Sequence, residues 1–292
     1  MNNNGVIIQA TGNSLYGRFA FNLAMSIRAN DRIIPITLIC DEEGIKDLKP
    51  YMLNFFTEIK YINEKDITFK GKKHHFLLKT MLYNYSPYQN TLFLDADTII
   101  NPKRMISYLF GELQHYNFVT SNNGYFDFKK NQQTLSTKTY QYWGDIDKIK
   151  MYYDLRDRLW QVNSTIIYFS KSKEAKNIFN LAEEIYRDEL SPKKENKWGF
   201  ADEYCFNIAL SKLQWEANKA PYNPIFIQFL GQRIDKNIIL RDYWGFTNGG
   251  HRVNPLLIRL YNEMVNKYSE SFQIMDRFFH VDKQNVIKER KP

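Results

Sequence analysis

The sequence predicts an α/β protein with a mostly parallel sheet covered by helices on both faces. Short apolar runs typical of buried strands alternate with segments of helical periodicity through the first two thirds of the chain. No internal repeat or low-complexity linker interrupts this alternation. The chain has 292 residues, 43% of them hydrophobic, which is enough to bury a large core. We therefore expect one large α/β domain or two small ones.

Strands are expected where apolar runs are bounded by turn residues, and helices where apolar residues recur every three to four positions. In the first helix, for example, Leu15, Phe19, Leu23 and Ile27 share one face. The expected strands are 5–10, 33–40, 58–62, 91–94, 117–121 and 164–170. The expected helices are 14–28, 44–54, 75–85, 103–113, 172–190 with Ser172 as its cap, and 255–275.

The alternation ends near residue 220, and the pattern is irregular from there to the last helix. We therefore expect one domain over residues 1–224 and a C-terminal extension over 225–292. The Gly/Asn/Gln-rich stretch 121–145 and the segment 191–199 are expected to be long loops.

Charge and cysteine content limit the function classes. The chain has 40 basic and 32 acidic residues, a net charge of +8, which suits a polyanionic partner or reflects a compositional habit of the source. Cys40 and Cys205 lie in apolar surroundings without metal-binding spacing, so we expect no disulfide framework. The N-terminus has no signal-peptide pattern and no apolar run reaches the ~18 residues of a membrane span, so we expect a cytoplasmic protein.

Two aspartates follow the strand at 91–94 in the segment TLFLDADTII. If the chain stays extended, Asp95 and Asp97 point to the same side and can share one cation. Ligand sites of parallel sheets lie beyond the carboxyl ends of strands, where Asp95 stands. Carboxylate oxygens suit Mg²⁺ or Mn²⁺, which leaves other positions for water and phosphate oxygens. These residues therefore predict a metal-bound diphosphate, with capping of a turn as the alternative.

The same spacing occurs in GDIDK, where Asp145 and Asp147 follow no apolar strand. We interpret this second copy as part of a solvated loop. Position after a strand, in addition to spacing, distinguishes Asp95 and Asp97.

Four segments, taken in order, resemble nucleotide-sugar glycosyltransferases of the GT-A (Rossmann-like) fold. The resemblance is to the glycogenin-like and lipopolysaccharide galactosyltransferase-like group, family 8-type, and covers roughly residues 5–224. The segments are CDEE, LLKTMLYNYSPYQNTLFLDADTIINP, VNSTIIYFSKSKEA and WGFADEYCFNIAL. The resemblance implies a mixed, mostly parallel sheet and a hexosyltransferase with a UDP-sugar donor and Mn²⁺ or Mg²⁺ as cofactor. Residues 1–224 would then be the nucleotide-sugar-binding and catalytic domain, and the extension 225–292 would complete the site and contact acceptor or partner.

The resemblance also implies roles for residues in the first half of the chain. The base and ribose would lie against residues at the end of the first strand, and a basic residue before the D-x-D strand would reach the donor. Asp95 and Asp97 would contact the metal and the ribose. The donor-binding positions are Gln9, Ala10, Thr11, Tyr16 and Lys79. The alternative for Gln9, Ala10 and Thr11 is a simple turn between strand and helix, and the alternative for Lys79 is an exposed lysine on a helix.

In the second half, Asn163 and Ser164 would contact the donor sugar, unless they are only the polar start of a strand. Asp202 and Glu203 would be the catalytic carboxylates, or would cap a helix. Trp198 and Gly199 would form part of the sugar pocket, unless Trp198 is a core residue.

The resemblance breaks at the C-terminus, where the family supplies a histidine as third metal ligand from a string that is absent here. His251, which follows a diglycine, is the preferred substitute and His280 the alternative. Arg252 would contact the diphosphate. An imidazole ligand would favour Mn²⁺ over Mg²⁺. His74 and His75 are expected on the surface.

The glycogenin-like resemblance favours retention of anomeric configuration, with Asp202 binding the sugar. If the enzyme inverts, Asp202 or Glu203 is the general base. A phosphatase with an aspartate nucleophile is a minor alternative, although the motif does not follow the first strand.

A non-enzymic alternative is a basic protein that binds nucleic acid or a membrane surface. It rests on the C-terminal KERKP and on a helical apolar stripe that could also be core. The two interpretations can combine, because a basic glycosyltransferase could act on a saccharide, a lipid-linked saccharide or modified nucleic acid as acceptor, with peripheral membrane contact. The stripe consists of Leu256, Leu257, Leu260, Tyr261, Met264, Val265 and Tyr268.

Overall fold

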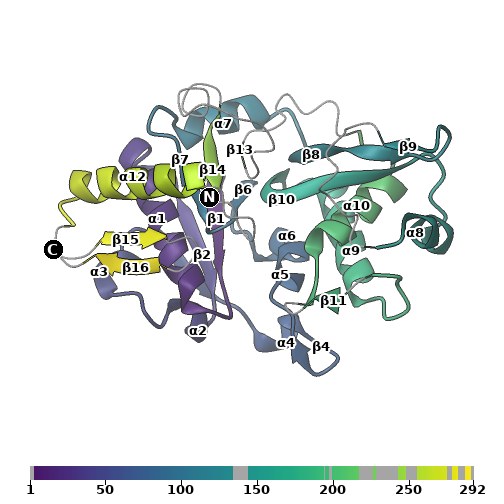
Figure 1. Ribbon diagram of the computed structural model, residues 1–292, viewed down its shortest axis with the longest axis horizontal. Helices are drawn as coiled ribbons and strands as arrows, with labels where there is room; N and C mark the ends of the chain where they lie inside the picture. The colour runs from purple at the N-terminus through teal and green to yellow at the C-terminus, as the bar shows by residue number, and fades with distance from the viewer. Residues whose placement is uncertain are drawn as a thin grey trace. The chain divides into compact units, whose positions relative to one another are not determined.

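The structure is a computed structural model whose chain divides into two compact units (Figure 1). Unit 1 comprises Met1–Ile62, Asn90–Gln114 and Pro224–Pro292, and unit 2 comprises Asn63–Gln89 and His115–Asn223. The residues it describes are 3–133, 144–193, 195–196, 199–216, 226–227, 243–247, 255–274, 278–281 and 287–290.

Four parallel strands form the centre of unit 1 in the order β3-β2-β1-β6. Their bounds are β1 Asn4–Ala10, β2 Ile36–Cys40, β3 Glu58–Tyr61 and β6 Asn90–Leu94. Every residue of β2 is buried, as expected for a strand covered on both faces. The predicted parallel α/β arrangement is confirmed.

Helices cover the strands of unit 1. Helix α1 (Ser14–Asn30) begins where the Asn13 side chain accepts a hydrogen bond from the backbone N–H of Leu15 at 2.8 Å. The predicted helix 44–54 is instead two short helices, α2 (Glu42–Ile45) and α3 (Pro50–Leu53). Pro50 starts the second one, because proline lacks the N–H that a continuous helix would need. Helix α7 (Ile106–Leu113) confirms the prediction at 103–113.

The C-terminal residues belong to unit 1. Strand β7 (Thr98–Ile100) pairs with β14 (Gly245–Thr247), which pairs with β13 (Phe226–Ile227). Helix α12 (Pro255–Ser271) packs beside α1 (Figure 1). A two-stranded pair, β15 (Phe278–Val281) and β16 (Ile287–Arg290), follows.

The apolar stripe on α12 is core rather than a docking surface. Leu257, Leu260, Tyr261 and Val265 are fully buried. The Tyr268 hydroxyl donates to the carbonyl of Ile100 at 2.7 Å. The stripe therefore gives no support to the membrane- or nucleic-acid-binding alternative. None of the helices in the described part of the chain is long and apolar enough to cross a membrane.

Unit 2 contains an antiparallel sheet of β10 (Arg158–Ser170), β8 (Phe118–Asp127) and β9 (Gln132–Gln133). The stretch 121–145, predicted to be a loop, thus begins as strand, and residues 134–143 of it lie outside the described residues. Helix α8 (Ile146–Tyr153) follows. Asp145 is its N-cap, so the second D-x-D is an exposed helix start and not a loop.

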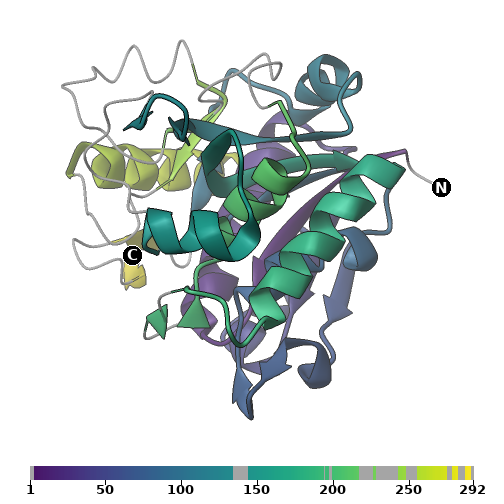
Figure 2. The same ribbon diagram turned by 90° about the vertical axis from the view of Figure 1, so that its right-hand side faces the viewer.

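Helices α9 (Lys173–Arg187) and α10 (Asp202–Lys212) pack side by side in unit 2 (Figure 2). Ser172 caps α9 through the N–H of Ala175, as predicted. The rings of Phe169 and Phe179 lie 4.8 Å apart at the core of this layer.

The segment before the D-x-D strand also belongs to unit 2. The predicted helix 75–85 is two short helices, α5 (Leu77–Thr80) and α6 (Leu82–Tyr85), which meet at Met81 with non-helical dihedral angles. The remaining elements are α4 Glu64–Ile67, β4 Thr68–Phe69, β5 Lys72–Lys73, β11 Glu195–Asn196 and β12 Gly199–Phe200.

Both cysteines are free and buried, which confirms that no disulfide links them. Burial, followed by the neighbouring Asp41, raises the pKa of the Cys40 thiol to about 12. Burial also raises the pKa of Cys205 well above its ordinary value. Neither thiol therefore supplies a thiolate nucleophile near neutral pH.

Two helical glycines provide a matched test of the close packing in unit 1. A Cβ at Gly44 would lie 1.9 Å from the carbonyl oxygen of Ala10, whereas one at Gly111 would meet no atom within 4 Å. We expect Gly44→Ala to lower the free energy of unfolding by about 2 kcal/mol, because backbone must move to admit the methyl group. Gly111→Ala should be neutral or stabilising. Thermal unfolding of both variants measures this, and equal midpoints would contradict it.

Candidate functional site

Asp95 and Asp97 lie on a tight turn at the carboxyl end of β6. The N–H of Thr98 donates to the carbonyl of Asp95 at 3.0 Å, so the chain reverses between β6 and β7. The prediction that the chain stays extended here is therefore wrong, although the position after a buried strand is as predicted. Both aspartates are half-buried. The turn presents two carboxylates at the edge of the sheet where parallel strands place ligands.

The end of β1 lies next to this turn within unit 1. Ile8 pairs with Leu94, so Gln9 and Asp95 are the next residues along neighbouring strands. The Gln9 side-chain amide donates to the Thr11 hydroxyl at 2.9 Å. Ala10, between them in sequence, is fully buried. The structure thus brings Gln9, Thr11 and Asp95 to one sheet edge.

Tyr16 stands near the start of α1, two residues after its first position. Its side chain is 37% exposed, which makes it one of the exposed large aromatic residues of the chain. Exposure at the start of α1 is compatible with stacking on a nucleotide base.

Asp41 shapes the loops at this edge, a role that the sequence analysis missed. Its carboxylate accepts from the backbone N–H of Gly12 at 2.9 and 3.0 Å and from that of Gly44 at 2.6 Å. Gly12 has φ of +77°, the left-handed region that favours glycine. The signal in the sequence is an aspartate directly after a strand and before a helix, which is typical of an N-cap.

Helix α12 supports the Asp97 side of the turn. Asn22 donates its side-chain N–H to the Tyr261 hydroxyl at 3.3 Å. Burial raises the pKa of Tyr261, and the negative charge of Asp97 raises it further. Tyr261 of α12 therefore belongs to the electrostatic surroundings of Asp97 within unit 1.

The residues present fit a divalent cation in part. Two carboxylates on one turn suit Mg²⁺ or Mn²⁺, which take their remaining ligands from water and phosphate oxygens. Within the described ranges no group of three His, Cys, Asp or Glu side chains could hold a metal. The third ligand stays a prediction. His251 and Arg252 lie outside the described residues, and of His280 the structure describes only the backbone in β15.

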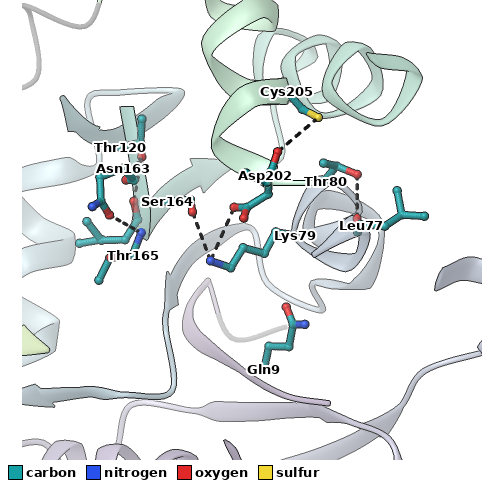
Figure 3. Close-up of polar contacts among 12 residues, drawn as sticks. Gln9, Leu77, Lys79, Thr80, Thr120, Asn163, Ser164, Thr165, Asp202 and Cys205 are labelled. Carbon is teal, nitrogen blue, oxygen red and sulfur yellow. Dashed lines mark hydrogen bonds and ion pairs between the residues drawn. The ribbon is translucent and has the colours of Figure 1, made fainter. Parts of the chain in front are cut away.

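Unit 2 carries a buried ion pair between Lys79 on α5 and Asp202 on α10 (Figure 3). The ammonium nitrogen lies 3.6 Å from Asp202 Oδ2 and donates to the Ser164 hydroxyl at 3.2 Å. The side chains are 9% and 2% exposed. The alternative of an exposed helix lysine is therefore wrong, and Lys79, Ser164 and Asp202 form one cluster.

Asp202 does not cap its helix. The N-cap of α10 is Ala201, without a side-chain cap hydrogen bond. Asp202 Oδ2 faces Lys79 and makes no hydrogen bond within the described part of the chain. A buried carboxylate oxygen in this state can accept a hydrogen bond from a ligand hydroxyl. Glu203, the next residue of α10, is half-buried.

A bulge in β10 presents Asn163 and Ser164. The pairing of β10 with β8 shifts between Asn163 and Ile167. Asn163 Oδ1 accepts from the N–H of Thr165 at 2.8 Å (Figure 3). The amide oxygen is therefore engaged with backbone.

Two buried polar residues that the sequence analysis missed hold this bulge. The Thr120 hydroxyl contacts the carbonyls of Asn163 and Ile166 at 2.9 and 3.0 Å. Asn207 on α10 accepts from the N–H of Val162 at 2.7 Å. An asparagine inside the apolar run CFNIAL was the available signal. Of the predicted sugar pocket, Gly199 lies in β12, and Trp198 is outside the described residues.

The parallel strands of unit 1, the antiparallel strands of unit 2 and their covering helices define the GT-A class of α/β fold. The solved structure of a glycosyltransferase shares this fold. The bifunctional glycosyltransferase WbbM is similar with a TM-score of 0.58 at 10% sequence identity, over 92% of this chain and 50% of that one. The chain thus spans half the length of WbbM.

Two further structures are similar at lower scores. The galactosyltransferase LgtC, solved with donor and acceptor sugar analogues, has a TM-score of 0.43 and 14% identity, over 72% of this chain and 70% of that one. Mouse xyloside xylosyltransferase 1 has a TM-score of 0.49 and 10% identity, over 85% and 98%. No family model matches the sequence, and no curated protein matches it.

The buried ion pair predicts coupled stability effects. Lys79→Met should lower the free energy of unfolding by about 3 kcal/mol, because it leaves the Asp202 carboxylate buried without its cation. The double variant Lys79→Met/Asp202→Asn should lose less than the sum of the two single variants. Urea unfolding measures all three.

The exposed pair between Lys46 and Glu43 is the control. Lys46→Met should leave the urea midpoint unchanged, since exposed pairs contribute little. Additive losses at Lys79 and Asp202 would contradict the coupling.

Proposed function

We propose that the protein is a metal-dependent glycosyltransferase that moves a hexose from a nucleotide diphosphate sugar, a UDP-sugar, to a hydroxyl acceptor. The observation that carries the proposal is the turn of Asp95 and Asp97 at the carboxyl edge of parallel strands. The fold of solved glycosyltransferases supports it by analogy.

The residues of unit 1 would bind the donor's nucleotide. Gln9, Thr11 and Tyr16 stand where a base and ribose would lie, with the backbone of Ala10 between them. Asp95 and Asp97 would hold Mn²⁺ or Mg²⁺, together with His251 as the predicted third ligand. Bound there, the ion would neutralise charge on the departing diphosphate. Arg252 would contact the same diphosphate.

The residues of unit 2 would bind the transferred sugar. Asp202 Oδ2 is buried beside Lys79, which suits it to accept a hydrogen bond from a sugar hydroxyl. Asn163 would contact the sugar from the bulge of β10, and the Ser164 hydroxyl accepts a hydrogen bond from Lys79. In the reaction the bond between the anomeric carbon and the diphosphate oxygen breaks, and a bond from that carbon to the acceptor oxygen forms.

The ion pair supports the retaining assignment. Asp202 is held as the buried counter-ion of Lys79, which suits the role of a fixed sugar-binding carboxylate. In a retaining reaction the acceptor's proton passes to the departing phosphate oxygen. If the products show inversion, Glu203 takes the role of general base. The anomeric configuration of the product distinguishes the two.

The acceptor is proposed as a saccharide, a lipid-linked saccharide or modified nucleic acid.

A phosphatase with Asp95 as nucleophile is the minor alternative function. It predicts hydrolysis of a simple phosphoester without nucleotide, and that hydrolysis would be lost in Asp95→Asn.

The two D-x-D sequences provide a matched test of the function. With Mn²⁺ and a panel of nucleotide sugars, we expect slow release of nucleotide diphosphate without acceptor. Asp97→Asn should reduce this rate on the order of 100-fold, because the turn loses a charged metal ligand. Asp147→Asn, at the same spacing on α8, should keep the wild-type rate. Neither hydrolysis nor binding of any donor, or full activity in Asp97→Ala, would contradict the proposal.

A further inference from the structure

His74 is buried in unit 2, with 3% of its surface exposed. The prediction that it lies on the surface is therefore wrong. Its carbonyl accepts from the N–H of Leu77 at 3.0 Å, at the start of the helix α5 that carries Lys79. His74 thus adjoins one of the two helices that supply the buried ion pair.

Three aromatic rings surround the imidazole. It stacks on Phe200 with ring centres 5.8 Å apart and planes at 24°. Tyr186 meets it edge-on at 5.8 Å and Phe69 at 5.6 Å. We call His74, Phe69, Tyr186 and Phe200 the His74 cage. Phe200 directly precedes Ala201, the N-cap of α10, and thus lies two residues before Asp202.

Hydrogen bonds inside the cage define the role of the histidine. The Tyr186 hydroxyl donates to the carbonyl of Phe200 at 3.1 Å, which uses its only proton. The same oxygen lies 3.3 Å from His74 Nδ1. With that proton used, the contact is a hydrogen bond when the imidazole carries its proton on Nδ1. A chain of donors then runs from His74 through Tyr186 to the backbone at Phe200.

Lys193 fixes the Tyr186 end of this chain. Its ammonium group donates to the carbonyls of Ile185 and Asp188 at 3.1 and 2.7 Å, and also to that of Tyr186. The same nitrogen lies 4.5 Å from the Phe200 ring centre. Burial lowers the pKa of Lys193. The end of α9 and the segment before α10 are therefore tied together.

We propose that His74 is a positioning residue that sets the distance between Lys79 and Asp202. The cage joins the start of α5 to the start of α10, and the ion pair spans the same two helices. Loss of the Nδ1 donor would free the backbone at Phe200 and move Asp202 relative to Lys79. This inference rests on the proposed function, because it assumes that Asp202 must be correctly placed for the sugar transfer.

Substitutions that mimic one ring nitrogen test the proposal. The amide nitrogen of Asn can replace Nδ1–H, whereas that of Gln reaches the position of Nε2. We expect His74→Gln and Tyr186→Phe each to lower kcat for donor hydrolysis on the order of 10-fold or more, as misplacement of reacting groups does. The Kd for nucleotide diphosphate, bound by unit 1, should stay unchanged. His74→Asn should recover most of the lost kcat.

The double variant His74→Gln/Tyr186→Phe should be no slower than either single variant, because both break one chain. His75→Gln, at the neighbouring residue, is the control and should keep the wild-type kcat. Wild-type kcat in both single variants would overturn the inference and leave the proposed function standing. If the proposed function itself is wrong, the wild-type protein will be inactive with every donor, or the Asp97→Asn variant will remain active.

A measurement on the wild-type protein tests the inference even if the variants do not fold. Imidazole ¹⁵N NMR should show His74 with its proton on Nδ1. A neutral ring protonated on Nε2 would overturn the inference whatever the variants do.

Discussion

A buried charge must keep its partner, and the local structure of unit 2 follows from this constraint. Asp202 is 2% exposed in its side chain and has Lys79 as its counter-ion. Leaving either charge alone in this surrounding would cost several kcal/mol. The short helix α5, the start of α10 and the bulge of β10 are consequently bound to one another through two side chains and the Ser164 hydroxyl. Asp202 Oδ2 accepts no hydrogen bond from the described residues.

In unit 1 the residues of the candidate site are brought together by the common edge of the parallel strands, not by a buried ion pair. The carboxyl ends of β1, β2 and β6 meet at this edge, so residues far apart in sequence become neighbours. Asp41 orders the loops by accepting backbone N–H groups. After the turn that carries Asp95 and Asp97, strand β7 pairs with the C-terminal strand β14, and the charge of Asp97 acts on Tyr261 of α12.

Local pattern predicted much of this, and long-range contacts account for what it missed. The alternation of apolar runs and helices predicted the parallel strands, and the apolar run TLFL predicted that Asp95 follows a buried strand. Periodicity could not show that Asp95 and Asp97 form a turn, because that depends on β7 pairing with β14. It could not show that Lys79 is buried or that His74 enters an aromatic cage, because their partners come from distant segments.

Crystals grown with Mn²⁺ and UDP provide the most direct test of the central claim. Anomalous scattering at the manganese edge would locate the ion independently of any assumed site. The account predicts one strong peak within coordination distance of Asp95 and Asp97 carboxylate oxygens and of the diphosphate. A bound nucleotide with no manganese at this turn, or with the peak at Asp145 and Asp147 instead, would contradict it.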